Sequence, residues 1–323
     1  MLIYKSYNPK PSDKLGASII KEAQKIDFVK YRKKVNIKFV YTSGLSNNYH
    51  YPRNIVHEII DLEGLKVECI SKSKEEVKYA LIHLHGGAYI SGFNDTYRKA
   101  ARKYLRCNNN MKVFSPRYSL APDNPFPKAL NEVVFLYKHL LDSGFKSENI
   151  IMAGDSAGGG LAIATTLFLR DNSFPLPKAI ITMSAWTNLG MNGESHEKNK
   201  YIDPMFGIGS LPLDVKAYTQ DFNIENPYIS PKYGDFTKFT DMIMFVGGNE
   251  IIESDTLDVA KKAQETNEVY VHDFKGMFHA FPFGFNMMAS SKAAWKIIKE
   301  YINKKLRDDA RWLIQQNTRI GLG

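Results

Sequence analysis

The sequence predicts an α/β fold in which a largely parallel sheet is covered by helices on both faces. Short apolar runs that suit buried strands alternate with helical patterns along most of the chain, and this alternation is typical of parallel sheets. The 323 residues are 44% hydrophobic and 24% charged, as in ordinary soluble globular proteins. The length therefore fits one large α/β domain with an additional element, or two smaller domains.

The elements follow one another in a regular order. Residues 1 to about 50 are polar and basic, with a helical pattern in DKLGASIIKEAQKIDFVKYRKK and no motif. The segment VHEIIDLEGLKVECISKS predicts a β-hairpin with Glu63-Gly64 at its turn. The strands after it are expected at about Tyr79–Leu84, Val113–Ser115, Ile150–Ala153, Ala179–Ser184, Met242–Val246 and Val269–His272, with helices in TYRKAARKYLRC, NEVVFLYKHLLDSG, GLAIATTLFLRD, SDTLDVAKKAQET and SSKAAWKIIKEYINKKL.

Two stretches fall outside this alternation. Residues 187 to about 225 mix Gly, Pro and Met with short helical pieces, and so long an insertion in a compact fold often forms a lid or a substrate-binding element. The tail from Arg307 is expected to be a further helix or a frayed end.

Charge and cysteine usage exclude several classes of function. The net charge is +9, but Lys and Arg are spread along the chain and cluster only in KYRKKVNIK at 30–38, so solvated lysines are expected rather than nucleic-acid binding. Cys69 and Cys107 provide neither a disulfide framework nor metal-ligand spacing. The start lacks the apolar core of a signal peptide, and no run approaches the ~18 residues of a membrane span. A cytoplasmic location without stable membrane insertion is expected.

The motif around Ser156 has two local interpretations. Gly154-Asp155-Ser156-Ala157-Gly158 follows a predicted strand and opens a predicted helix, which is the context of a nucleophilic serine in a strand–turn–helix elbow. A Gly-x-Ser-x-Gly match also arises by chance in about one chain in ten of this length. Because Asp and Ser are favoured N-cap residues, the local pattern alone leaves nucleophile and helix cap open.

Further groups are expected at the carboxyl ends of neighbouring strands, where open parallel sheets bind ligands. Gly86 and Gly87 follow the strand 79–84 in HLHGGAYISG, and their backbone N–H groups can point at a developing oxyanion together with that of Ala157. His279 lies in KGMFHAFPF just after the last strand. Its position favours the general base that a serine hydroxyl requires.

The third partner of a Ser…acid…His order must lie between Ser156 and His279. Glu250 comes soonest after the strand 242–246 and its Gly-Gly turn, so it is the preferred acid. Asp255 is the reserve, because it looks like the N-cap of the following helix. Glu253 is expected to be solvated.

Five motifs occur together in this chain: HGGAY at 85–89, YSLAPDNPFPKAL at 118–130, GDSAGG at 154–159, GGNEIIESD at 247–255 and GMFHAF at 276–281. Together they resemble the hormone-sensitive-lipase-like branch of the α/β-hydrolases, which includes bacterial carboxylesterases and acetyl esterases. The similarity runs from about residue 50 to 303. It implies an α/β-hydrolase fold with a helical cap: residues 1–50 as an N-terminal cap segment, 51–306 as the catalytic domain with a cap insertion at about 189–222, and 307–323 as a tail.

The resemblance also implies roles for site residues. Ser156 corresponds to the nucleophile and His279 to the general base and then acid. Glu250 occupies the position of the usual Asp, as in the relatives that use Glu. The oxyanion hole would be formed by Gly86, Gly87 and Ala157, and the oxyanion loop would be held near the elbow by His85, Tyr118 and Asp155.

Three residues depart from the family pattern. Asp123 stands where LAPE is common, Ala88 replaces the third glycine of HGGG, and Asn188 stands where Asp is usual. None of these changes removes a catalytic group, although each alters the surroundings of the pocket.

The expected function is that of a serine carboxylesterase, which hydrolyses short-chain acyl esters through an acyl-enzyme with a Ser-His-Glu triad and needs no metal or organic cofactor. An amidase or formamidase would use the same triad. A non-catalytic receptor on a hydrolase scaffold typically lacks the histidine, whereas His279 is present. The expected partner is a small-molecule ester, and the resemblance is compatible with a homodimer. Four aromatic residues either line a compact pocket or pack in the core: Tyr89, Trp186, Phe206 and Phe281.

Overall fold

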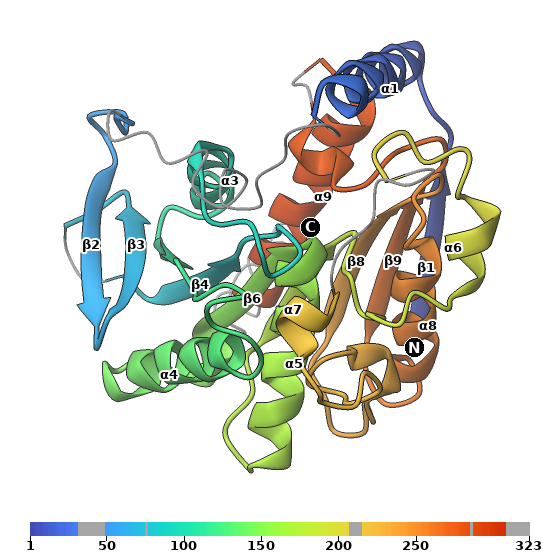
Figure 1. The fold of residues 1–323 in the computed structure, drawn as a ribbon. Coiled ribbons are helices and arrows are strands. Elements are labelled where there is room, and N and C mark those ends of the chain that lie inside the picture. The colour runs from blue at the N-terminus through green and yellow to red at the C-terminus, as the bar shows by residue number, and fades with distance from the viewer. Residues whose placement is uncertain (32–48, 75–76, 207–214, 285–286, 308–323) are drawn as a thin grey trace, which may run out of the picture.

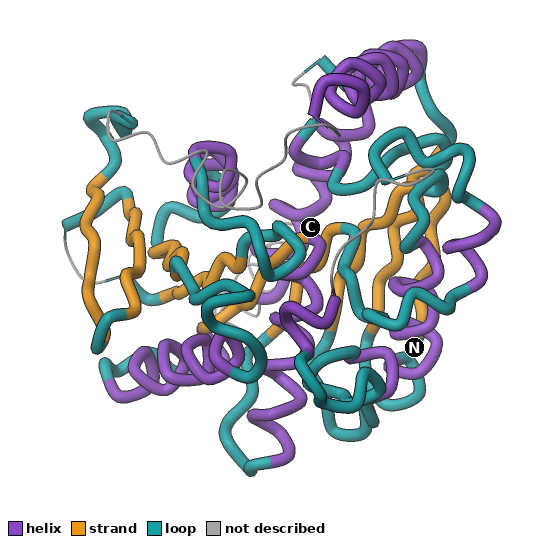
Figure 2. The backbone as a smooth tube through the Cα atoms, in the orientation of Figure 1, coloured by secondary structure: helices purple, strands orange, loops and turns teal. Residues whose placement is uncertain are grey.

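The computed structural model describes residues 1–31, 49–74, 77–206, 215–284 and 287–307. Within them a nine-stranded sheet runs through the molecule in the order β1-β9-β8-β7-β6-β4-β5-β3-β2 (Figures 1 and 2). The predicted tail lies beyond Arg307, outside the described residues.

The strands confirm the predicted pattern. The hairpin has its turn at Glu63 and Gly64, which have φ values of 52° and 95°, as two-residue hairpin turns require. The hairpin strands are antiparallel to each other and β3 is antiparallel to β5, whereas the remaining pairs are parallel. The strands are β1 Leu2–Tyr7, β2 Val56–Leu62, β3 Leu65–Ser71, β4 Tyr79–Leu84, β5 Met111–Pro116, β6 Ile150–Asp155, β7 Ala179–Met183, β8 Met242–Gly247 and β9 Val269–Phe274.

The assignment of residues 1–50 to a cap is wrong for residues 2–7. Strand β1 lies at one edge of the sheet, parallel to β9, with Leu2 opposite Val269 and Tyr7 opposite Phe274. The segment LIYKSY gave no strand signal because an edge strand buries little, and three of its six residues are exposed.

Helices cover both faces of the sheet, as predicted. Helices α4, α5 and α8 pack into one apolar cluster with alternate strand residues such as Ile82. Helices α3 and α9 pack into a second cluster with the intervening residues, such as Leu81. Successive side chains of a strand point to opposite faces, so both faces are buried. The helices are α1 Pro11–Tyr31, α3 Asp95–Leu105, α4 Lys128–Asp142, α5 Ser156–Asp171, α6 Glu194–Lys198, α7 Val215–Thr219, α8 Glu253–Ala263 and α9 Ala289–Lys305, with 3-10 turns at Ser147–Asn149, Pro231–Tyr233 and Phe281–Phe283.

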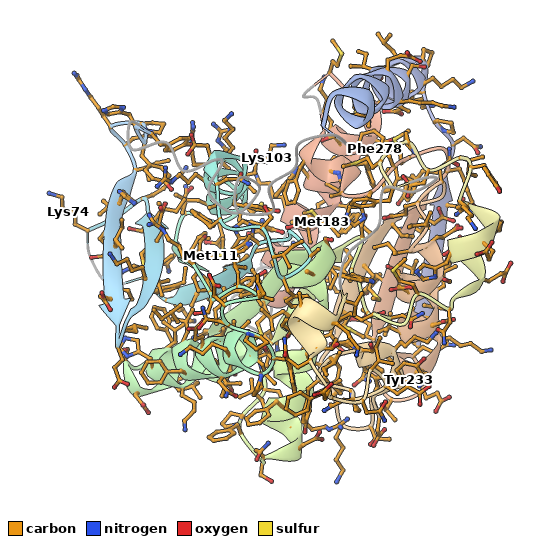
Figure 3. The ribbon with its side chains drawn as sticks, viewed as in Figure 1. Lys74, Lys103, Met111, Met183, Tyr233 and Phe278 are labelled. Atoms are coloured by element: carbon orange, nitrogen blue, oxygen red, sulfur yellow. The ribbon has the colours of Figure 1, made fainter. Side chains whose placement is uncertain are left out.

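Side chains fill the space between these layers (Figure 3). Met111 of β5 and Met183 of β7 are fully buried, whereas Lys74 lies at the periphery of the molecule in Figure 3. The predicted interruption at 187–225 contains only the short helices α6 and α7 among its described residues. Among the helices of the described ranges, none has the length and apolarity that crossing a bilayer requires.

Candidate active site

Ser156 lies on a strained turn between β6 and α5. Its φ of 50° is left-handed, which is uncommon for a residue other than glycine and marks stored backbone strain. The turn leaves no space for larger neighbours: a Cβ at Gly154 would lie 2.4 Å from the Gly158 carbonyl oxygen, and a Cβ at Gly158 would lie 2.3 Å from that of Leu84. The glycines therefore permit the sharp elbow that lifts Ser156 to the edge of the sheet.

Glu250 and His279 form a buried pair at the same edge. The His279 Nδ1 atom lies 2.9 Å from Glu250 Oε2, and both residues have less than a tenth of their surface exposed. The other carboxylate oxygen of Glu250 accepts hydrogen bonds from the Ser184 hydroxyl at 2.9 Å and from the Gly247 N–H. Burial raises the pKa of Glu250, while the hydrogen bond and charge of His279 act in the opposite direction.

The two other candidate carboxylates lie elsewhere. Asp255 is fully buried in the first turn of α8, and its Oδ2 atom accepts the N–H groups of Thr187 and Asn188 at 3.0 and 2.9 Å. The prediction that Asp255 is the N-cap of this helix is wrong. Its carboxylate instead binds the backbone of the segment after β7. The expectation that Glu253 is solvated is also wrong, since it is 5% exposed and accepts from Asn199 Nδ2.

The glycine loop after β4 is braced by three side chains. The His85 ring donates from Nδ1 to the Gly86 carbonyl at 2.8 Å and stacks on Tyr118 with ring centroids 4.0 Å apart. The Tyr118 hydroxyl donates to the His85 carbonyl at 2.6 Å. Asp155 accepts the Gly86 N–H at 3.1 Å. These contacts tie the loop to the elbow of Ser156.

The Gly86 N–H, predicted as an oxyanion donor, is therefore already used by Asp155, and the prediction is wrong for this one group. Gly87 and the next residue, Ala88, line the cavity described below, with φ values of 117° and 55°. The Ala157 N–H belongs to the first turn of α5, where N–H groups have no acceptor within the helix.

Asp155 is a second buried acid beside the elbow. Burial raises its pKa from 3.8 to about 7, while the charge of His279 and hydrogen bonds from Gly86 and Tyr97 act in the opposite direction. Tyr97 comes from α3 and was not singled out in the sequence, because it lies in a helical pattern that gave no site signal.

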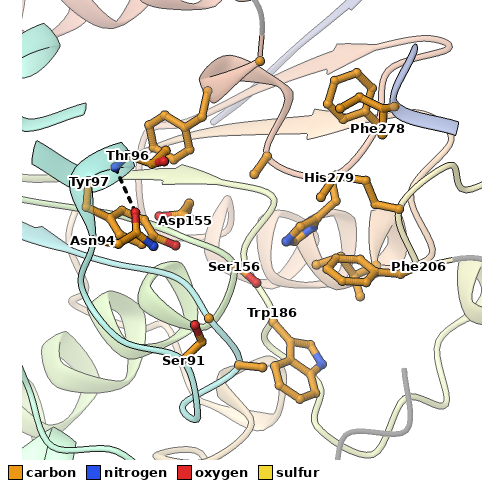
Figure 4. Close-up of a pocket in the computed structure, with 18 of the residues that line it drawn as sticks. Ser91, Asn94, Thr96, Tyr97, Asp155, Ser156, Trp186, Phe206, Phe278 and His279 are labelled. Carbon is orange, nitrogen blue, oxygen red and sulfur yellow. Dashed lines mark hydrogen bonds between the residues drawn. The ribbon is translucent and has the colours of Figure 1, made fainter. Parts of the chain in front are cut away.

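A cavity of about 480 Å³ opens above Ser156 and His279. Figure 4 shows His279 and Phe206 on one side of it, Trp186 below, and Tyr97 and Asn94 on the opposite side, with Ser156 between them. Its walls are mostly apolar, with a polar patch at the start of α3 formed by Ser91, Asn94, Thr96 and Tyr97; the apolar walls come from Ile20, Ile90, Trp186, Met205, Phe206, Ile252, Phe278 and Phe283.

The four aromatic candidates divide into two groups. Trp186 and Phe206 line the cavity. Tyr89 is 1% exposed and stacks on Tyr218 with ring centroids 3.9 Å apart, and Phe281 is fully buried against Phe274. The latter two are core residues, and neither is among the residues that line the cavity.

The described residues contain no group of three or more His, Cys, Asp or Glu side chains placed to hold a metal ion. Both cysteines are free and buried. At the cavity, the structure brings together the Ser156 hydroxyl, the His279 imidazole and, behind it, the Glu250 carboxylate.

Comparison with known proteins gives consistent findings. A family model described as the alpha/beta hydrolase fold matches residues 81–283. An esterase of Acinetobacter venetianus is 31% identical over 255 residues, covering 78% of this chain and 84% of the esterase. An acetyl-hydrolase of Streptomyces hygroscopicus is 28% identical over 246 residues, covering 76% and 82%.

A solved structure of an esterase from the bacterial hormone-sensitive lipase family is also similar. It superposes with a TM-score of 0.79 at 25% sequence identity, covering 92% of this chain and 99% of that one. The similarity therefore extends over nearly the whole of both chains.

Proposed function

This chain belongs to the α/β-hydrolase family, in its hormone-sensitive-lipase-like branch, and is a carboxylic ester hydrolase; we propose that it cleaves short-chain acyl esters through an acyl-enzyme on Ser156. The observation that carries the proposal is the buried pair of Glu250 and His279, 2.9 Å apart, at the cavity lined by a serine with left-handed backbone. A base held by a carboxylate and facing a strained serine is the arrangement that activates a hydroxyl.

His279 acts as the general base in the first half of the reaction. It takes the Ser156 hydroxyl proton on Nε2 while the oxygen attacks the ester carbonyl, and then delivers that proton to the departing alcohol. Glu250 accepts from Nδ1–H, which fixes the ring tautomer and stabilises the imidazolium. Water repeats the sequence on the acyl-enzyme and releases the carboxylic acid.

The oxyanion of each tetrahedral intermediate is held by backbone N–H groups. We assign Gly87 and Ala157 to this role, with Ala88 beside them at the cavity wall. Loss of one such donor typically costs about 3–4 kcal/mol of transition-state stabilisation. His85, Tyr118 and Asp155 keep the glycine loop in place through the contacts described above.

The proposed acyl preference follows from the cavity. A volume of about 480 Å³ must hold both the acyl and alcohol parts of the ester, and Trp186 is fixed beneath Ser156. Its backbone N–H donates to the Ser156 carbonyl at 2.9 Å, and its indole N–H donates to the Asn188 carbonyl at 3.2 Å. Since both the backbone and the indole ring of Trp186 are held in place, we expect acetate to butyrate esters to be preferred over decanoate.

The test is Ser156→Ala, assayed with p-nitrophenyl acetate and labelled in parallel with a fluorophosphonate. The variant is expected to fold, to lose hydrolysis by at least 10⁴-fold and to lose labelling. Persistent hydrolysis by the folded variant would remove Ser156 from the mechanism. An unlabelled, inactive wild-type protein would indicate a binding scaffold, and faster cleavage of an acetanilide than of the acetate ester would indicate an amidase.

A further inference from the structure

Helix α6 and its C-cap residue are bound directly to the turn that carries Glu250. Asn199 Nδ2 donates to the Glu250 carbonyl at 2.9 Å, and the Ser195 hydroxyl donates to the Ile251 carbonyl at 2.6 Å. Both side chains are at least nine-tenths buried. The predicted cap insertion is therefore not a separate layer at this point, because it shares hydrogen bonds with the catalytic acid's own backbone.

The Asp203 carboxylate binds both the turn that carries Glu250 and the segment that leads to Phe206. Its Oδ2 atom accepts the Ile251 N–H at 2.8 Å, one residue after Glu250. Its Oδ1 atom accepts the N–H groups of Met205 and Phe206 at 2.7 and 3.0 Å. Asp203 is 6% exposed, so these three bonds form where water competes little for the donors.

Phe206 carries the second half of the connection to the site. Its ring packs edge-on against the His279 ring with centroids 4.6 Å apart, and both rings line the cavity (Figure 4). The Asp203 carboxylate thus binds the turn that carries Glu250 through one oxygen. Through its other oxygen it binds the backbone of Phe206, whose ring packs against His279.

We propose that Asp203 is a positioning residue for ester hydrolysis: it fixes the Glu250 turn and the Phe206 wall relative to each other, so that the pair Glu250–His279 and the cavity wall keep one arrangement. The inference rests on the proposed roles of Glu250 and His279. Asp203 touches neither the ester nor the reacting atoms. It acts through the Ile251 N–H on one side and through Phe206 on the other.

The carboxylate is required because three backbone donors face two oxygens. An asparagine at this position has a single acceptor oxygen, and its amide nitrogen would face a backbone N–H on the other side. Asp203→Asn therefore keeps the size of the side chain and breaks one of the two connections. Misplacement of catalytic groups by about 1 Å can cost on the order of 10²-fold in rate.

The experiment compares wild type with four purified variants of the full chain: Asp203→Asn, Phe206→Ala, the double variant and the control Asp13→Asn. Asp13 is also fully buried and accepts the N–H groups of Lys10 and Ser290 at 2.8 and 2.9 Å, and it does not line the cavity. Values of kcat and KM for p-nitrophenyl acetate and butyrate are measured at a temperature where circular dichroism shows each protein folded.

We expect Asp203→Asn to lower kcat at least tenfold, while Asp13→Asn lowers the melting temperature and keeps kcat within threefold of wild type. The losses in kcat/KM caused by Asp203→Asn and by Phe206→Ala should not multiply in the double variant, because both substitutions disturb the same cavity wall at Phe206. The combined loss should fall short of the product by threefold or more.

A folded Asp203→Asn protein with wild-type kcat, or fully multiplicative losses with Phe206→Ala, would overturn the inference. If Asp203→Asn does not fold, Asp203→Glu replaces it, since the added methylene displaces the carboxylate and the same loss of kcat is expected. Failure of the proposed mechanism would look different: Ser156→Ala would then stay active, whereas failure of this inference alone leaves Ser156→Ala inactive and Asp203→Asn unimpaired.

Discussion

Replacing Gly158 by alanine tests whether the elbow and the glycine loop are packed as tightly as the structure indicates. A Cβ at this position would lie 2.3 Å from the Leu84 carbonyl oxygen and 2.4 Å from that of His85. Real Cβ contacts are not shorter than 3.0 Å, so 3.0 − 2.3 gives a displacement of at least 0.7 Å. The displaced atoms are backbone at the start of the oxyanion loop, which no side-chain rotation can relieve.

We therefore expect Gly158→Ala to lower kcat for p-nitrophenyl acetate by on the order of 10²-fold, since misplacement of catalytic groups by about 1 Å can cost this much. Overpacking should also destabilise the fold by about 1–3 kcal/mol, measured by urea unfolding. Gly190→Ala is the control, because a Cβ there meets nothing closer than 3.4 Å. Wild-type kcat in a folded Gly158→Ala protein would refute the packing argument.

Two further substitutions test the buried acids. Glu250→Gln should lower kcat by about 10³–10⁴-fold with the fold intact, because an amide NH₂ facing His279 Nδ1 selects the wrong ring tautomer. The control Glu253→Gln, three residues further along the chain, should keep most of the activity. Equal losses of kcat in the two variants would contradict the assignment of Glu250 as the acid. In the folded protein, the Asp155 carboxyl group keeps its proton up to about pH 7, because its pKa is raised to about 7. In the unfolded chain, the same group loses its proton near pH 4. Wild-type stability should therefore fall as the pH rises from 5 to 8, by about 2–3 kcal/mol from this group. Asp155→Asn should lack that part of the decrease in urea unfolding, and identical pH dependence of the two proteins would contradict the raised pKa.

The features that could be predicted from the sequence share one property: their signal is local. Buried strands read as apolar runs, the hairpin turn carries Glu63-Gly64, and the elbow needs small residues on both sides of Ser156. The order of these pieces along the chain then places Ser156, Glu250 and His279 at the same sheet edge, because parallel strands end at one edge.

The features that were missed depend on contacts between distant segments. Strand β1 pairs with β9 across more than 260 positions of the sequence, and LIYKSY alone does not reveal this partner. The use of the Gly86 N–H by Asp155 joins residues 69 positions apart, and Asp203 meets Ile251 across 48 positions. Whether an aromatic residue such as Tyr89 faces a cavity or the core also depends on backbone direction, which composition does not specify.

The Ser184 hydroxyl connects the ends of three strands. It follows β7, donates to the Glu250 carboxylate after β8 and accepts the Ala280 N–H after β9, each at 2.9 Å. Because the bridge joins the segments after β7, β8 and β9, Glu250 and His279, the proposed acid and base, are tied to the end of the sheet itself. We therefore expect ester hydrolysis and the fold to be lost in a single thermal transition, measured as residual activity and circular dichroism along the same heating ramp.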